Sequence, residues 1–138
     1  MAGRIKKTLA IALTPLIYRM LKVILVDDDP VTHFILENTF IDEAVEFFAY
    51  DSAEDLLENV GYFKNSILLL DVNMPKVNGL ELWKHLNENY DISECKTVVF
   101  TKVVDVQNAF KKINNNLYFA DKHSVDMKLI TDINDGIK

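Results

Sequence analysis

Carboxylates follow two apolar stretches of the chain and could together bind a metal ion. Asp27 and Asp28 come directly after the apolar run 23–26, and Asp71 comes directly after the run 67–70. Carboxylates that share one pocket repel one another, so at least one pKa rises unless a cation neutralises them. Oxygen ligands with room for water suit Mg²⁺. An acidic loop that caps a helix and turns the chain is the alternative interpretation of the first group.

Five short apolar runs would position these residues. The runs are continuous rather than alternating, which is typical of parallel strands buried on both faces. They cover residues 23–26, 45–50, 67–70, 97–100 and 117–120. Segments with helical spacing lie between and after them. Right-handed crossovers then predict a three-layer α/β sandwich, with the site at the carboxyl ends of the strands.

Each intervening segment shows an apolar stripe that predicts one face of a helix. The predicted stripes are Val31, Phe34, Ile35 and Phe40 after Pro30; Leu56, Leu57 and Val60 after the N-cap Ser52; Leu80, Leu82, Trp83 and Leu86 after Gly79; Val106, Phe110 and Ile113; and Met127, Ile130 and Ile133.

Charge is distributed unevenly along the chain. Residues 1–22 carry five bases and no acid, whereas the remainder carries ten bases and twenty-one acids. So acidic a body disfavours nucleic-acid binding, because affinity for phosphate backbones comes from clusters of Lys and Arg. Cys95 is the single cysteine, which excludes an internal disulfide and two-cysteine metal motifs. This cysteine usage fits a reducing cytoplasm.

Residues 1–20 form a separate N-terminal extension, and residues 21–138 are predicted to be one domain. Basic residues precede the apolar stretch 9–13, as in a signal peptide, but the apolar run ends by Tyr18 and is too short to span a bilayer. Three interpretations stay open. The extension is an artefact of the start site, since Met20 directly precedes the domain; it is an added helix that packs on the domain or a partner; or it binds or targets to a membrane.

Four stretches of the chain together resemble the signature of response-regulator receiver domains. They are Val26-Asp27-Asp28-Asp29-Pro30, Leu69-Leu70-Asp71-Val72-Asn73-Met74-Pro75 with Asn78-Gly79, Val98-Val99-Phe100-Thr101, and Phe119-Ala120-Asp121-Lys122. The acids, the hydroxyl and the lysine stand at the ends of the first, third, fourth and fifth predicted strands. The resemblance covers residues 21–138. It implies a CheY-like, flavodoxin-like fold with a five-stranded parallel sheet in the order 2-1-3-4-5 and helices on both faces.

The resemblance also implies a phosphorylation site with its metal ion. Asp71 matches the phosphoacceptor, whose carboxylate becomes an acyl phosphate. Asp28 matches the direct Mg²⁺ ligand of the acid pair, and Asp27 matches its neighbour, which usually holds the metal through water. Asp71 and the backbone carbonyl of Asn73 would complete the metal site.

Three further residues match family positions that hold the phosphoryl group or respond to it. Thr101 matches the hydroxyl that binds a phosphoryl oxygen, and Lys122 matches the base that pairs with the phosphoryl group. These groups and Mg²⁺ would offset the charge of the transferring phosphoryl group. Phe119 matches the aromatic switch position that moves into the space that Thr101 vacates; plain core packing is the alternative role.

Two positions depart from the family pattern. Proline usually follows the lysine, often through a cis bond, whereas His123 stands here. A non-proline cis bond costs about 3–4 kcal/mol, so a trans 122–123 bond is predicted. Lys102 replaces a small residue after Thr101, and either shields the acyl phosphate or points into solvent. His33 and His85 are predicted to be surface residues.

The function implied by the resemblance is that of a single-domain response regulator in the cytoplasm. It would accept a phosphoryl group from a histidine kinase or a histidine phosphotransfer protein and then act on a downstream protein target, with phosphorylation-dependent dimerisation left open. No enzyme activity beyond self-phosphorylation and dephosphorylation, no nucleic-acid partner and no membrane partner are expected. A phosphate-independent interaction module is the alternative. An aspartyl-phosphate enzyme of the haloacid-dehalogenase type is disfavoured, because Asn73 stands where such enzymes place a second Asp.

Overall fold

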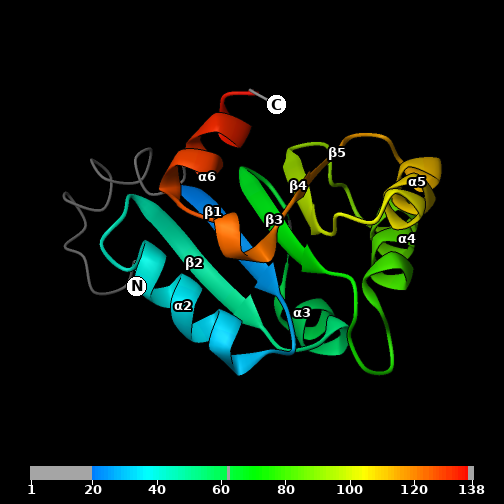
Figure 1. Cartoon of the computed structure of the whole chain (residues 1–138), viewed down its shortest axis with the longest axis horizontal. Helices are drawn as coiled ribbons and strands as arrows, with labels where there is room; N and C mark the ends of the chain where they lie inside the picture. Colours follow the sequence, from blue (N-terminus) through cyan, green and yellow to red (C-terminus); the bar gives the residue numbers. More distant parts are fainter. Residues whose placement is uncertain (1–19, 62, 137–138) are drawn as a thin grey trace.

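A five-stranded parallel sheet forms the centre of the molecule (Figure 1). The computed structural model describes residues 20–61 and 63–136. The strands stand in the order β2-β1-β3-β4-β5, as predicted from the sequence. Their bounds are β1 Leu21–Val26, β2 Val45–Tyr50, β3 Ser66–Asp71, β4 Cys95–Phe100 and β5 Leu117–Ala120. Strand β3 is buried along its whole length, which explains its uninterrupted apolar sequence before Asp71.

Helices cover both faces of the sheet, and α2 and α6 lie on one face while α3, α4 and α5 lie on the other. Their bounds are α2 Pro30–Phe40, α3 Ala53–Asn59, α4 Gly79–Asn89, α5 Val104–Ile113 and α6 Met127–Asn134, with a short 3₁₀ turn η2 at Lys122–Ser124. Side chains alternate along each strand, so neighbouring strand residues serve different faces. Leu69 packs with the α2 and α6 layer, and Leu70 packs with the layer of α3, α4 and α5.

Side-chain caps begin the helices directly after the strands. Ser52 accepts a hydrogen bond from Asp55 N–H, as its position before the predicted helix suggested. Asp29, Asn78 and Asp126 cap α2, α4 and α6 in the same way. Such caps satisfy amide groups that the first helical turn leaves without partners. They therefore fix where these four helices start, whereas α5 begins after Val103 with no side-chain cap.

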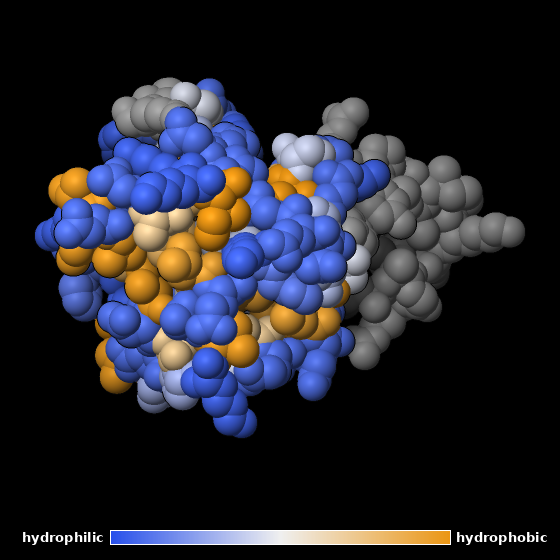
Figure 2. Space-filling model, turned by 90° about the vertical axis from the view of Figure 1, so that its right-hand side faces the viewer, coloured by the Kyte–Doolittle hydropathy of each residue, from blue (hydrophilic) through white to orange (hydrophobic). Residues whose placement is uncertain are grey.

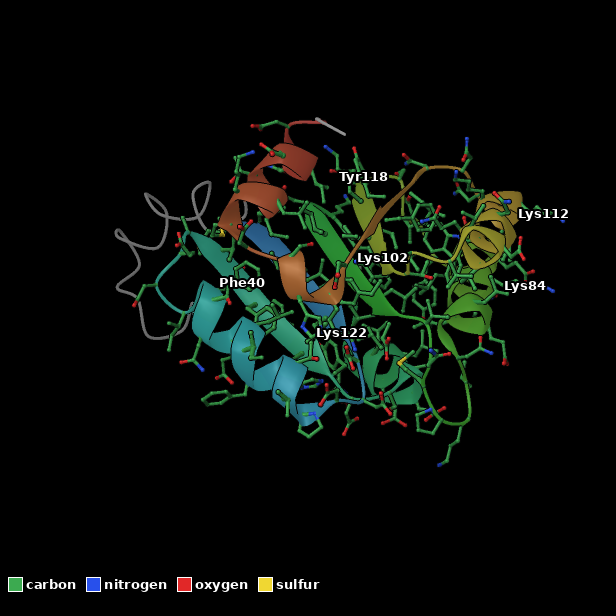
Figure 3. All side chains as sticks on the ribbon, viewed as in Figure 1. Phe40, Lys84, Lys102, Lys112, Tyr118 and Lys122 are labelled. Atoms are coloured by element: carbon green, nitrogen blue, oxygen red, sulfur yellow. The ribbon has the colours of Figure 1, made fainter. Side chains whose placement is uncertain are left out.

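The predicted buried stripes are correct for α3 to α6, but the prediction for α2 is wrong in three of its four residues. Val31, Phe34 and Ile35 are 60%, 68% and 50% exposed. The buried residues of α2 are instead Thr32, Leu36 and Phe40. Leu36 and Phe40 pack into the core layer of the sheet, and Phe40 (Figure 3) lies against Phe47. Thr32, on the same face, donates its hydroxyl to Asp29 Oδ2 at 3.1 Å, so its polar group is satisfied where it is buried.

Helices α4 and α5 lie side by side at the opposite end of the molecule (Figure 1). This end faces the viewer in Figure 2, where apolar areas lie among hydrophilic residues. Both helices are amphipathic, and their largest apolar side chains, Trp83 and Phe110, are buried. Burial of Trp83 confirms its predicted packing role. The N-terminal extension lies outside the described residues except for Met20, and within the described part no helix is long and apolar enough to cross a membrane.

Candidate functional site

The ends of four parallel strands bring the predicted site residues to one edge of the sheet. Asp71 is the last residue of β3, and Asp27 follows β1, which is hydrogen-bonded to β3. Thr101 follows Phe100, the residue that pairs with Asp71 across β3 and β4. Lys122 opens the turn η2 after β5. Parallel strands end at the same edge, so residues distant in sequence converge there.

Three carboxylates form a cluster at this edge. Oxygen atoms of Asp27, Asp28 and Asp71 all lie within 4.8 Å of one another. Asp27 is fully buried, Asp71 is 8% exposed and Asp28 is exposed. Burial, and then the charge of Asp27, raise the pKa of Asp71 to about 6. An all-oxygen donor set with one side open to water fits a hard divalent cation such as Mg²⁺.

Among the described residues, Lys122 forms ion pairs with two of these acids. Its Nζ lies 2.7 Å from Asp27 Oδ2 and 3.7 Å from Asp71 Oδ1. Partial burial alone would lower the pKa of Lys122, but its pairing with Asp27 and Asp71 raises it. The same lysine opposes the rise in the pKa of Asp71. In this state Lys122 therefore pairs more closely with Asp27 than with the predicted phosphoacceptor.

Short-range hydrogen bonds hold Asp27 in place after β1. The backbone N–H of Asp29 donates to Asp27 Oδ1 at 2.8 Å. The His33 Nε2 lies 2.5 Å from the carbonyl oxygen of Asp27 and can donate to it. His33 is thus partly buried and bonded at the site, and the prediction that it is a plain surface residue is wrong. From the sequence, the place of His33 near the start of a helix that follows Asp27 and Asp28 was the one indication that it lies near the site.

Helix α4 begins against the backbone of Asp71, the predicted phosphoacceptor. A Cβ on Gly79 would lie 2.3 Å from the carbonyl oxygen of Asp71 and 3.0 Å from the Cα of Val72. The Gly79 N–H donates to the Val72 carbonyl at 2.9 Å. The glycine in the motif therefore permits this close approach. Asn73 lies exposed in the intervening loop, and its role as a carbonyl ligand stays a prediction.

The hydroxyl of Thr101 is engaged within its own loop. Thr101 Oγ1 accepts a hydrogen bond from the Val103 N–H at 3.1 Å. The Thr101 carbonyl accepts from Gln107 Nε2 at 3.3 Å. Binding of a phosphoryl oxygen by the threonine hydroxyl would compete with the bond from Val103. Its position at the end of β4 agrees with the sequence prediction.

Lys102 forms an ion pair across two loops. Its Nζ lies 2.8 Å from Asp121 Oδ2, and its side chain is 76% exposed. That pairing lowers the pKa of Asp121. Lys102 and Lys122 lie near the arrowhead of β3 in the view of Figure 3. Lys102 is thus largely exposed and pairs with an acid of the neighbouring loop, and its predicted role in shielding the acyl phosphate stays a prediction.

The predictions for the loop at Lys122 and for Phe119 have different outcomes. Every peptide bond between described neighbours is trans, so the prediction for the 122–123 bond is confirmed. Asp121 caps the turn by accepting from the His123 N–H at 2.9 Å. Phe119 is partly buried against the core, and Lys111 Nζ lies 5.6 Å from the centre of its ring. Switching by Phe119 stays a prediction.

Two known regulators match part of this chain in sequence. The DNA-binding transcriptional regulator NtrC of Proteus hauseri is 34% identical over 65 residues, which cover 47% of this chain and 14% of NtrC. The Regulator of RpoS of Escherichia coli K12 is 24% identical over 91 residues, which cover 65% of this chain and 27% of that protein. The chain thus spans about a quarter or less of these relatives.

Solved structures share the fold, and a family model identifies it. The chemotaxis protein CheY4 of Vibrio cholerae superposes with a TM-score of 0.68 at 19% identity, covering 83% of this chain and 96% of CheY4. A CheY-like receiver domain protein of Methanospirillum hungatei JF-1 gives a TM-score of 0.62 at 18% identity, covering 84% and 93%. Residues 23–133 match the response regulator receiver domain. The chain therefore belongs to the response regulator receiver domain family of two-component signalling.

Proposed function

We propose that this receiver domain accepts a phosphoryl group on Asp71, with Mg²⁺ as cofactor, and works as a response regulator. The observation that carries the proposal is the cluster of Asp27, Asp28 and Asp71 oxygens within 4.8 Å of one another, with Lys122 paired to it. The donor would be a histidine kinase or a histidine phosphotransfer protein. This cluster has the negative charge for a metal ion and an adjacent base for the phosphoryl group.

The residues at the cluster would divide the work as follows. Asp27, Asp28, Asp71 and the Asn73 carbonyl would hold Mg²⁺, which supplies charge neutralisation for the phosphoryl oxygens when bound. An Asp71 carboxylate oxygen forms a bond to phosphorus while the bond from phosphorus to the donor nitrogen breaks and its electron pair stays on the donor. Positioning and charge stabilisation are most of what such a transfer requires.

Lys122 and Thr101 would then hold the product. Lys122 Nζ already lies 3.7 Å from Asp71 Oδ1, so a small movement brings it to the phosphoryl group. Thr101 would exchange the bond from Val103 for a phosphoryl oxygen. The movement of Thr101 opens space toward Phe119, and the acyl phosphate shifts the balance between two arrangements of α5, β5 and α6. That surface would act on a downstream protein, with dimerisation as one mode of action.

The remaining features of the proposal concern partners and location. The acidic body favours protein partners over nucleic acid, and a cytoplasmic protein fits the single buried Cys95. The proposed chemistry is confined to Asp71 itself, with no external substrate.

Intact mass spectrometry with a small phosphodonor tests the proposal. Acetyl phosphate with Mg²⁺ should add one phosphoryl group, and chelation of Mg²⁺ should prevent the gain. Asp71→Asn should abolish the gain, whereas Asp105→Asn, which removes an exposed acid at the start of α5, should not. Absence of any gain in a protein that binds Mg²⁺ would contradict the proposal and favour a phosphate-independent interaction module.

A further inference from the structure

The outer face of α2 carries an apolar stripe that the fold leaves uncovered. Its members are Val31, Phe34, Ile35 and Ile41, between 50% and 68% exposed. Phe34 and Ile35 stand three and four residues after Val31, on the same side of the helix, and Ile41 is the C-cap residue. We call these four residues the α2 stripe. Several large exposed apolar residues on one short helix are a common feature of contact surfaces.

Two polar side chains near the α2 stripe bond to the helix backbone. The Asn38 side chain donates to the Phe34 carbonyl at 2.8 Å, and the Thr39 hydroxyl donates to the Ile35 carbonyl at 2.8 Å. Both polar groups thus bond to the backbone of their own helix. The α2 stripe is therefore suited to contact with other apolar side chains.

We propose that residues 1–19 of the same chain cover the α2 stripe. The first argument is where this segment joins the domain. The described chain begins beside Leu21, which packs in the same core layer as α2 and pairs with Val45. Ile41 ends α2 only four residues before Val45. The segment therefore joins the domain at the end of the sheet where the α2 stripe finishes.

The second argument is length. Helix α2 has 11 residues, so it is about 16 Å long at 1.5 Å per residue. Nineteen residues reach about 28 Å even if fully helical, and roughly twice that if extended. The segment can therefore run along the whole α2 stripe whatever its backbone conformation.

The third argument is chemical complementarity. The segment carries the apolar residues Leu9, Ile11, Leu13, Leu16 and Ile17 and four bases, with no acid. The face that would receive it combines the apolar α2 stripe with acids and with no Lys or Arg in α2. The exposed acids beside the stripe are Glu37, Asp42 and Glu43. Apolar contact and opposite charge favour this occupant.

Coverage of α2 would reach the phosphorylation site. The first turns of α2 hold Asp29 and His33, which bond to Asp27. A protein that approaches the Asp71 edge across α2 would have to displace the segment, whereas a small phosphodonor would not. The coverage itself does not depend on the proposed phosphorylation, so its test uses no phosphodonor.

Thiol accessibility in the full chain tests the coverage. Phe34→Cys places a thiol in the α2 stripe, and Asn108→Cys places a matched exposed thiol on α5, while Cys95 is buried and 3% exposed. We expect Phe34→Cys to react about tenfold more slowly with an aromatic disulfide reagent than the same thiol in a chain with Leu9, Leu13 and Ile17 changed to Asp, as docking for about nine-tenths of the time would give. Asn108→Cys should react at the same rate in both chains.

Varying the protein concentration distinguishes coverage by the same chain from coverage by a second copy. Slow reaction that persists on dilution supports coverage by the segment of the same chain, whereas protection that disappears on dilution assigns the α2 stripe to a second copy and overturns the proposal. Equal rates with and without the Asp substitutions also overturn it, and leave the stripe to another protein. Ile35→Cys, at a site that is half exposed, repeats the test if Phe34→Cys does not fold.

Discussion

The proposed phosphorylation site has two halves that differ in how far their residues are already in place. At the ends of β1 and β3, Asp27 is fully buried and Asp71 nearly so, and a backbone hydrogen bond holds Asp27 in place. At the ends of β4 and β5, Thr101 and Lys102 are engaged elsewhere: Thr101 with the Val103 N–H and Lys102 with Asp121. The acidic half is assembled in advance, and the other half has contacts to exchange.

This difference suggests an order of events for a switch. The three acids already lie close together, with oxygens within 4.8 Å of one another, whereas Lys122 is paired with Asp27 at 2.7 Å. In the proposed switch, a metal ion at the acids would first release Lys122 from Asp27, and a phosphoryl group would then compete for Lys122 and Thr101. Substitutions that unbalance the charge of the buried acids, including removal of Lys122, should therefore affect the free energy of unfolding. Substitution of the exposed Lys102 should leave it nearly unchanged.

The largest effect on stability is expected from Lys122→Met. Removing the lysine leaves the fully buried Asp27 without its ion pair. We expect the free energy of unfolding to fall by about 2–3 kcal/mol in metal-free buffer, somewhat less than for a fully enclosed pair. Because Mg²⁺ can replace the missing cation, it should restore more stability to Lys122→Met than to the unaltered chain. Urea unfolding with and without Mg²⁺ measures the loss of stability and its recovery. If Lys122→Met were as stable as the unaltered chain, the ion pair with Lys122 would not be needed to stabilise the buried Asp27.

A somewhat smaller effect is expected from Gly79→Ala. The new Cβ would meet the Asp71 carbonyl oxygen at 2.3 Å, so backbone must move. Overpacking of this kind costs about 2 kcal/mol, and the displaced Asp71 should also take up phosphoryl groups more slowly. Gly61→Ala is the matched control, since nothing lies within 4 Å of its added Cβ. Equal stability of the two variants in urea unfolding would contradict the close approach of α4.

The raised pKa of Asp71 predicts a pH effect of about 1–2 kcal/mol after allowance for the water that reaches the carboxylate. The folded state keeps a proton on Asp71 up to a pKa of about 6, while the unfolded state releases it near the ordinary value of 3.8. This stabilisation is present below the unfolded pKa and is lost as pH rises through about 6. In metal-free buffer, the stability of the chain relative to Asp71→Asn should therefore decline over this range. A difference that stays flat with pH would contradict the raised pKa.

The smallest effect is expected from Lys102→Ala. Its pair with Asp121 joins side chains that are 76% and 36% exposed, and such pairs contribute little. We expect a change below about 0.5 kcal/mol in the free energy of unfolding. Since Lys102 is held by Asp121, the lifetime of the acyl phosphate should also change little. A markedly shorter lifetime, followed by mass spectrometry after removal of the donor, would show that Lys102 shields the acyl phosphate.

The sequence predicted the sheet and the site edge well because both depend on strong local signals. Continuous apolar runs identify buried parallel strands, and Asp71 and Thr101 stand directly after two of them. The face of α2 could not be predicted from spacing, because apolar residues occur on both sides of that helix. Its rotation depends on which apolar residues pack on the assembled sheet, and these are Leu36 and Phe40.

The pairing of Lys122 was equally hidden from the sequence. Asp27 and Asp71 are both acids at the ends of neighbouring strands, and only the path of the turn η2 places the lysine closer to Asp27. The bond from His33 to the Asp27 carbonyl likewise requires the turn between β1 and α2. Contacts made by loops depend on the assembled sheet, so residue type and spacing alone do not specify them.

The most direct test of the account is to locate the phosphoryl group. The chain is phosphorylated with acetyl phosphate and Mg²⁺, the acyl phosphate is trapped by reduction with borohydride, and the modified residue is identified by peptide mapping. We predict modification at Asp71 alone, because it combines the acidic cluster with Lys122 at 3.7 Å. Modification at Asp27 or Asp28, or a phosphoryl group that resists reductive trapping because it lies on a histidine, would contradict the account.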